Sequence, residues 1–221
     1  MAGYRHPAIA REGWGIVGAI AVLAVLVWWR AGEVAALPLV LLALFLLYLF
    51  RDPFRKVPSR PLGVVSPLDG RVSGVCESRD PFLERPQVRR ISLRLSPLGV
   101  HSLRCPIEGK VMERWSKTLS RGGTQVVAYW IRTDEDDDLV WTLIGPRRWI
   151  RLDLQPGERV GQGQRCGFAY LPVLSQLYLP LASRVLVQPG QRVRAGEAVL
   201  AEFVHRQSQS QQPVTGAVHA V

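Results

Sequence analysis

Hydrophobic residues are concentrated in two uninterrupted stretches near the start of the chain. The first runs from Trp14 to Trp29 and the second from Val34 to Phe50, and neither contains a charged residue. Only the short polar break at residues 30–33 separates them. At ~1.5 Å per residue each stretch forms a helix about 25 Å long, slightly shorter than the ~30 Å hydrocarbon core of a bilayer. The pattern predicts a helical hairpin that either crosses the membrane or enters it and returns.

The pattern changes after Pro58 to short β-branched segments separated by Gly and Pro. Apolar and polar residues alternate in several of them, which is typical of strands buried on one face. The acidic run from Asp134 to Asp138 lies between two such segments and predicts a solvated hairpin turn, because it lacks the spaced ligands and the glycine of a calcium loop. The predicted strands are 63–65, 71–75, 90–95, 125–131 and 139–144.

These patterns divide the chain into three predicted parts. Residues 1–57 form a membrane anchor with helices at about 14–29 and 34–50, and residues 58–206 form a mainly β domain. Residues 207–221 carry a run of Gln and Ser and are expected to be a disordered tail.

Two internal repeats refine the prediction for the β domain. The segment 155–163 (QPGERVGQG) recurs as 188–196 (QPGQRVRAG), and 67–72 (PLDGRV) recurs as 106–111 (PIEGKV). Each copy begins with a tight-turn signal and continues into a strand, so two related hairpins are expected to lie side by side. This arrangement resembles the barrel-sandwich hybrid of lipoyl and biotinyl carrier domains. No lysine lies at a hairpin tip in a carrier-like motif, so a carrier function is not expected.

Composition restricts the partners and the compartment. The 28 basic residues exceed the 18 acidic residues by ten, and all but three of the basic residues are arginine. This surplus favours an anionic lipid surface or nucleic acid, but there is no reader helix or aromatic stacking platform for nucleic acid. The three cysteines are Cys76, Cys105 and Cys166, whose wide spacing fits neither a disulfide framework nor a metal site. We therefore predict no metal, no nucleic-acid partner and a reduced compartment.

Charges at the ends of the two apolar stretches predict their orientation. Arg5 and Arg11 precede the first stretch, and Arg51, Arg55 and Lys56 follow the second. The turn between them carries one arginine and one glutamate, which cancel. Because positive residues flank membrane segments on the cytoplasmic side, we expect an inner (cytoplasmic) membrane protein whose β domain faces the cytoplasm.

Several motifs together resemble the short, membrane-anchored form of the phosphatidylserine decarboxylase family. They follow the family's order and spacing over residues 11–204. The resemblance rests on 50–53 (FRDP), 66–72 (SPLDGRV), 95–111 (LSPLGVHSLRCPIEGKV), 178–180 (YLP) and 189–197 (PGQRVRAGE).

The resemblance implies a proenzyme that cuts itself at a Gly-Ser bond and converts that serine into a pyruvoyl group. The pyruvoyl carbonyl then forms an imine with the substrate amine and accepts electrons as carbon dioxide leaves. An aspartate and a histidine of the family assist self-cleavage, with the histidine as base and the aspartate orienting it. These two residues match Asp69 and His101.

The family's Gly-Ser falls on Pro172-Val173 when the chain is matched without gaps. Valine has no hydroxyl, so it can neither attack the preceding carbonyl nor become a pyruvoyl group. We therefore expect no pyruvoyl cofactor and predict that Asp69 and His101 are vestigial catalytic residues. The nearest serine is Ser175, whose use would move the bond by two residues, or about 7 Å along a strand.

Three functional hypotheses follow. The first is a pseudoenzyme of phospholipid metabolism that is not cleaved and binds an aminophospholipid or a partner enzyme. The second is an active phosphatidylserine decarboxylase that makes phosphatidylethanolamine and matures at a non-standard serine such as Ser175. The third is a membrane-tethered β scaffold without a lipid pocket. Expected partners are anionic or aminophospholipid headgroups, an active paralogue, or a second copy of the chain.

Overall fold

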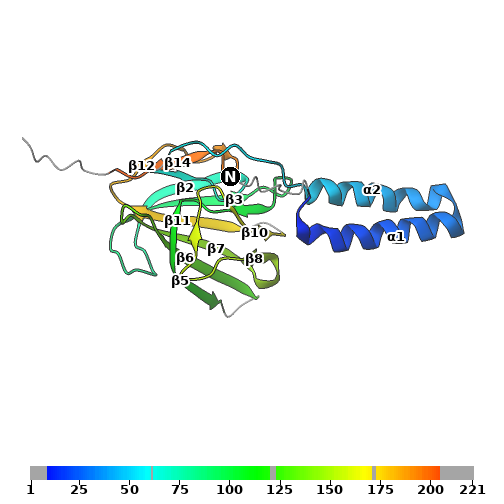
Figure 1. Cartoon of the computed structure of the whole chain (residues 1–221), viewed down its shortest axis with the longest axis horizontal. Coiled ribbons are helices and arrows are strands. Elements are labelled where there is room, and N and C mark those ends of the chain that lie inside the picture. The colour runs from blue at the N-terminus through cyan, green and yellow to red at the C-terminus, as the bar shows by residue number, and fades with distance from the viewer. Residues whose placement is uncertain (1–8, 61, 120–122, 171–172, 205–221) are drawn as a thin grey trace, which may run out of the picture.

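The computed structural model describes residues 9–60, 62–119, 123–170 and 173–204. Within them a two-helix hairpin projects from one end of a β domain (Figure 1). The mainly β prediction is confirmed, and so are the N-terminal helices. The predicted tail 207–221 lies outside the described residues.

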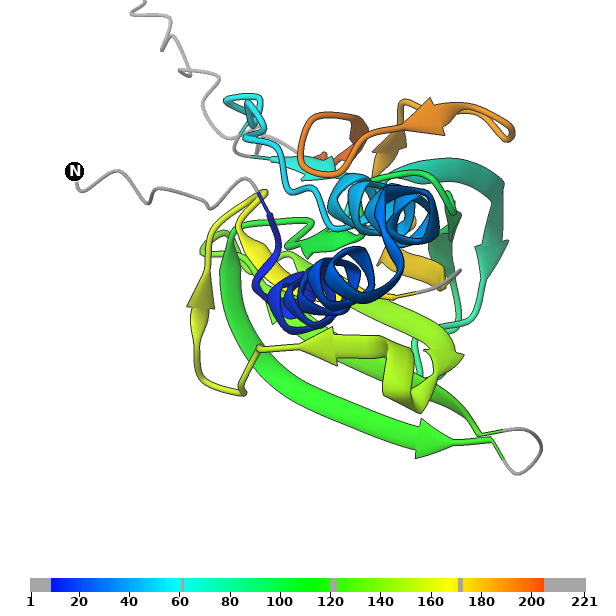
Figure 2. The same cartoon turned by 90° about the vertical axis from the view of Figure 1, so that its right-hand side faces the viewer.

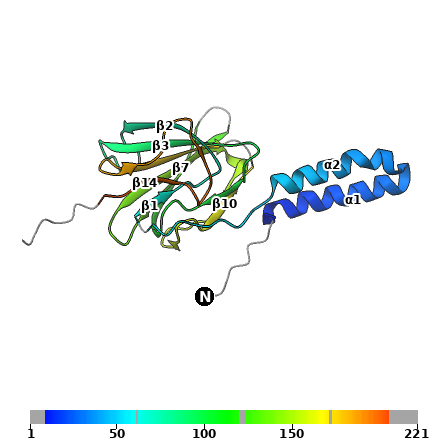
Figure 3. The same cartoon turned by 90° about the horizontal axis from the view of Figure 1, so that it is seen from above.

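The hairpin consists of α1 (Trp14–Ala31) and α2 (Glu33–Leu49), which pack against each other along their length (Figure 3). Gly32 joins them with a positive φ of 85°, a conformation that glycine adopts without strain. The turn of the short helix η1 (Arg11–Gly13) precedes α1. Large apolar side chains are exposed along both helices, including Trp29 at 84% and Val34 at 87%. By length and composition one helix, Arg11–Ala31, is able to cross a membrane, whereas Glu33–Leu49 is shorter.

The β domain contains three sheets within the described residues. The largest has the strand order β13-β2-β3-β11-β7-β6-β5-β9, and two three-stranded sheets have the orders β1-β14-β12 and β4-β10-β8. All strand pairs are antiparallel. The strands are β1 (Gly63–Val65), β2 (Gly70–Ser78), β3 (Val88–Leu95), β4 (Ser102–Arg104), β5 (Gly109–Thr118), β6 (Thr124–Arg132), β7 (Asp138–Pro146), β8 (Ile150–Leu152), β9 (Arg159–Val160), β10 (Arg165–Ala169), β11 (Leu174–Pro180), β12 (Arg184–Val185), β13 (Arg192–Val193) and β14 (Val199–Glu202).

Each predicted strand is present, and most extend by one to three residues beyond the expected limits. The acidic segment forms the β6–β7 turn as expected, where Thr133 accepts from Asp136 and donates to Asp137 through the main chain. Its last residue differs from the prediction. Asp138 is buried at the start of β7 and pairs with Arg85 and Arg132, because two arginines converge on that strand end.

The two sequence repeats form equivalent main-chain contacts. Val193 pairs with Gly70 where β13 meets β2, and Val160 pairs with Gly109 where β9 meets β5. In the 188–196 copy the N–H of Gly190 donates to the carbonyl of Val72 over 2.7 Å. In the 155–163 copy the N–H of Gly157 donates to the carbonyl of Val111 over 2.7 Å. The 67–72 and 106–111 copies are also neighbours, since Val65 donates to the carbonyl of Pro106 and Arg104 donates to that of Pro67.

Close backbone packing accounts for the repeated glycine at the start of β2 and β5. A Cβ atom on Gly70 would lie 2.0 Å from the carbonyl oxygen of Arg94. On Gly109 it would lie 2.3 Å from the carbonyl oxygen of Arg132. Both positions therefore exclude any side chain, and the duplicated sequence preserves a duplicated backbone approach.

Candidate active site

The carboxylate of Asp69 lies where three separate segments meet. It accepts the backbone N–H of Val100 over 3.1 Å and that of Ala195 over 2.7 Å. The third partner of the carboxylate is the guanidinium of Arg55, a residue just past the hairpin, with which it forms an ion pair of 2.9 Å. Charge-assisted bonds of this kind are about twice as strong as neutral ones. Asp69 therefore fixes the loop before His101 to the C-terminal repeat.

His101 is buried in the loop that leads into β4. Its Nδ1 contacts the carbonyl oxygen of Ala169 over 2.7 Å, and its Nε2 contacts that of Pro97 over 2.9 Å. A neutral imidazole has one N–H, so it donates to one of these carbonyls at a time. The ring also stacks on Phe168, with 6.0 Å between centroids. The imidazole is thus held between β10 and the 96–99 turn.

The structure brings the two predicted residues close but links them indirectly. Asp69 binds the N–H of Val100, the residue immediately before His101. Within the described ranges, no hydrogen bond joins the Asp69 carboxylate to the His101 ring. The catalytic roles predicted for both residues stay predictions.

Val173 occupies the position where the family's serine is expected, and its partner Pro172 lies outside the described residues. Its side chain is 1% exposed and belongs to the main hydrophobic core. Its carbonyl oxygen accepts the N–H of Leu95 over 3.0 Å. A Cβ on Gly145 would lie 3.1 Å from Val173 Cγ2, so the isopropyl group already fills the space beside the neighbouring strand. A pyruvoyl group is formed from a serine residue. The apolar Val173 side chain is therefore incompatible with the cofactor that the resemblance implies.

Ser175 lies two residues further on, in β11 between β3 and β7. It is fully buried, and its hydroxyl oxygen accepts the indole N–H of Trp141 over 2.9 Å. Side chains on a strand alternate, so Ser175 points to the same face as Val173 and Leu177. This serine has a hydrogen-bonded role inside the sheet.

Comparison with known proteins decides the family. The sequence model for "Phosphatidylserine decarboxylase" matches residues 42–121. The chain is 38% identical to a phosphatidylserine decarboxylase proenzyme of Nitrosomonas europaea, over 90% of this chain and 97% of that protein. A proenzyme of Symbiobacterium thermophilum is also 38% identical, and one of Ralstonia nicotianae is 36% identical, each over 90% of this chain and 98% of its own length. The chain belongs to the phosphatidylserine decarboxylase family. No solved structure gives a significant match.

The phosphatidylserine decarboxylase motif at 50–53 has a structural role that sequence reasoning left unassigned. Asp52 is 2% exposed and lies at the base of the hairpin. It accepts the hydroxyl of Ser102 over 2.9 Å and pairs with Arg165 over 2.9 Å and with Arg104 over 3.4 Å. Burial lowers the pKa of Arg104, and the Asp52 carboxylate opposes that effect. The Asp52 cluster ties the anchor to β4 and β10.

Aromatic side chains extend the same junction toward His101. Phe50, at the end of α2, stacks on Phe168 with 5.5 Å between centroids and meets Tyr170 edge-on at 6.1 Å. Phe168 and Tyr170 contact each other at 5.0 Å. Both come from β10 and its end, which also supplies the carbonyl that faces His101. Alternating aromatic residues at 168 and 170 are the only sequence signal for this cluster.

Proposed function

We propose that this phosphatidylserine decarboxylase family member stays a single uncleaved chain and acts as a membrane-anchored pseudoenzyme of phospholipid metabolism. Its role would be to bind an aminophospholipid or a partner enzyme without decarboxylation. The observation that carries the proposal is the buried Val173 side chain at the expected self-cleavage position. A hydrocarbon side chain provides no nucleophile for acyl transfer.

The surroundings of Val173 support the same proposal. Its side chain is packed among core residues and its carbonyl accepts the N–H of Leu95, so both groups of Val173 that the structure describes serve the packing and pairing of the strands. The retained Asp69 has backbone and arginine partners that stabilise the fold by themselves. The chain can therefore keep this fold although the nucleophile is absent.

Membrane anchoring by the helical hairpin is part of the proposal. The apolar side chains of α1 and α2 are exposed over most of both helices, and lipid would cover them. Arg11, Arg51, Arg55 and Lys56 lie at the base of the hairpin, whereas Arg30 and Glu33 lie at its tip. The positive-inside bias then places the base and the β domain on the cytoplasmic side of the inner membrane.

We further propose that the β domain is a barrel-sandwich hybrid. Its support is the pair of repeated contacts, in which each Pro-Gly turn donates to the strand that follows an acid-Gly turn. Val65 and Arg104, which precede the 67–72 and 106–111 segments, each donate to the first residue of the other segment.

An active decarboxylase that matures at Ser175 is the second candidate. It is favoured by the relatives, which are named proenzymes and align over 90% of this chain. It is opposed by the position of Ser175, because cleavage before it would cut a strand that pairs on both edges. The membrane-tethered scaffold is the remaining alternative.

Denaturing gel electrophoresis and intact mass of the purified full chain test the proposal. One chain of 24.7 kDa is expected. Two chains, the smaller beginning with a blocked residue near position 173 or 175, would contradict it and support the enzyme. Native mass spectrometry of the full chain with added phosphatidylserine or phosphatidylcholine then separates the remaining hypotheses. Preferential retention of phosphatidylserine supports a headgroup site, and equal retention contradicts the lipid-binding version of the proposal.

A further inference from the structure

Three arginines and a tryptophan share the short segment that leads from the end of β7 into β8. Arg147, Arg148 and Trp149 form the helix η2, and Arg151 follows in β8. The three arginines are exposed, and Trp149 is 38% exposed. Arg147, Arg148 and Arg151 line a shallow hollow of about 580 Å³ together with Ile150. We call these residues, 147–151, the arginine loop.

The positive charge of the arginine loop is not neutralised by the protein. Across the described part of the chain, no carboxylate pairs with Arg147, Arg148 or Arg151. A second basic hollow, around Arg55 and Arg104, is different because Asp69, Glu197 and Asp52 balance those charges. The arginine loop is therefore free to attract an external anion.

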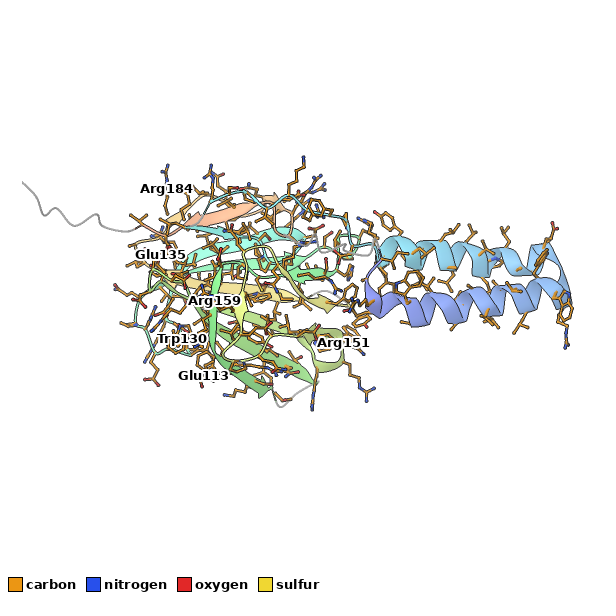
Figure 4. The ribbon with its side chains drawn as sticks, in the orientation of Figure 1. Glu113, Trp130, Glu135, Arg151, Arg159 and Arg184 are labelled. Atoms are coloured by element: carbon orange, nitrogen blue, oxygen red, sulfur yellow. The ribbon has the colours of Figure 1, made fainter. Side chains whose placement is uncertain are left out.

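The arginine loop lies at the end of the β domain from which the helices project. In Figure 4 the labelled Arg151 lies on that side, whereas Arg184 lies at the opposite end. Figure 2, which looks onto the helix end, shows η2 and β8 on the near side of the domain. A membrane entered by the hairpin would face this end.

Contacts to β10 hold the loop in place relative to the hairpin. The carbonyl of Trp149 accepts the N–H of Tyr170 over 2.8 Å, and Arg151 pairs with Phe168 in the sheet. Arg151 also lies over the Tyr170 ring, 5.6 Å from its centroid. The same two aromatic residues contact Phe50 at the base of α2. The loop and the hairpin base thus form one continuous packed surface.

We propose that the arginine loop docks the β domain onto the anionic headgroups of the membrane that holds the hairpin. The occupant is a bilayer surface that contains anionic phospholipid, whose phosphates match the three guanidinium groups. Trp149 is suited to the headgroup region, because its ring is apolar and its N–H is polar. Each arginine near such a surface contributes about a fivefold preference for it. The inference rests on the membrane anchoring proposed above and not on the pseudoenzyme assignment.

Hydrogen exchange of the full chain in lipid nanodiscs tests the docking. Amides of residues 147–152 are expected to exchange at least about fivefold more slowly in discs with anionic phosphatidylglycerol than in phosphatidylcholine discs. About 0.5 M salt should remove most of this protection, since it shortens the screening length to a few ångström. Exchange in 184–186, at the opposite end, should be the same in both discs.

Two matched double variants define the specificity of the effect. Arg148→Gln with Arg151→Gln should abolish the lipid-dependent protection, whereas Arg159→Gln with Arg184→Gln removes the same charge elsewhere and should leave it intact. Equal exchange of 147–152 in anionic and neutral discs would overturn the inference. Equal protection by inorganic phosphate in neutral discs would also overturn it, because the loop would then bind a free anion. Failure of the chain to co-float with liposomes would instead contradict the anchoring itself.

Discussion

Trp141 and Ser175 form a buried hydrogen bond across two neighbouring strands of the large sheet. The indole N–H in β7 donates to the hydroxyl in β11 over 2.9 Å. Trp141 pairs directly with Leu177, so Ser175 is its diagonal neighbour on the same face. The serine nearest to the expected cleavage position is therefore engaged by a large core side chain.

Replacing Ser175 by alanine tests that relationship. Ser175→Ala leaves the buried indole N–H without an acceptor, which should lower the free energy of unfolding by about 1–3 kcal/mol. The matched control is Ser183→Ala, because the buried Ser183 hydroxyl has no hydrogen-bond partner among the residues that the structure describes. Its removal should be neutral or slightly stabilising in the same denaturant titration. If Ser175→Ala converts a two-chain protein into one chain, Ser175 is the maturation nucleophile and the pseudoenzyme proposal is wrong.

Restoring the family's Gly-Ser bond tests the retained machinery around His101. The double substitution Pro172→Gly and Val173→Ser should give partial self-cleavage into two chains, because it supplies both the hydroxyl and a permissive preceding residue. Adding His101→Ala should prevent the cleavage. Pro172→Gly with Val173→Ala is the control and should stay intact. Cleavage that persists without His101 would refute the base role predicted for that residue.

The Asp52 cluster should be a large contributor to stability. Asp52→Ala removes the carboxylate from the buried Arg104 and the partly buried Arg165, and should cost about 3–5 kcal/mol. Asp134→Ala is the matched control, because its pair with Arg159 is exposed on both sides and should cost less than about 1 kcal/mol. Thermal unfolding of the full chain in detergent compares the two. Similar melting temperatures for both variants would contradict the assigned role of Asp52.

Asp138 should make stability fall at acidic pH. Burial alone would raise its pKa, but hydrogen bonds from Arg132, Trp130 and Arg85 outweigh burial and hold the pKa below the ordinary value of 3.8. A lowered pKa means that the folded state favours the carboxylate, so this stabilisation is complete above about pH 4 and is lost as the pH falls through the folded pKa. Asp138→Asn should be less stable than the native chain at pH 7, and the difference should shrink below pH 4. A difference that is constant between pH 7 and pH 3 would exclude this linkage.

Local patterns predicted the two helices and the longer strands, but they gave no signal for short strands such as β4, β8 and β12. The two apolar stretches became α1 and α2, and the alternating segment 90–95 became part of β3, because burial of one face requires a pattern that a single segment carries by itself. Asp138 shows the limit of this reasoning. As one member of an acidic run it resembled a solvated turn residue, but Arg85, 53 positions away, makes it a buried anion.

The candidate site was less predictable because its contacts join distant segments. Asp69 and His101 were identified through the family resemblance, and no local signal indicated that Asp69 binds the backbone at Val100 and Ala195. Asp52 was visible within a motif, yet its partners Ser102, Arg104 and Arg165 lie at least 50 residues away.

The amino-acid sequence by itself determined the apolar hairpin, the longer strands, the two repeats and the absence of a side-chain hydroxyl at position 173, since each is a property of neighbouring residues or of one side chain. Only the tertiary structure decided which repeat pairs with which and where the His101 ring nitrogens find partners. It also decided that three arginines, which pair with no carboxylate of the described residues, share the end of the domain that bears the helices. Those features depend on hydrogen bonds and charges brought together by chain folding, and such long-range contacts leave no periodic trace in the sequence.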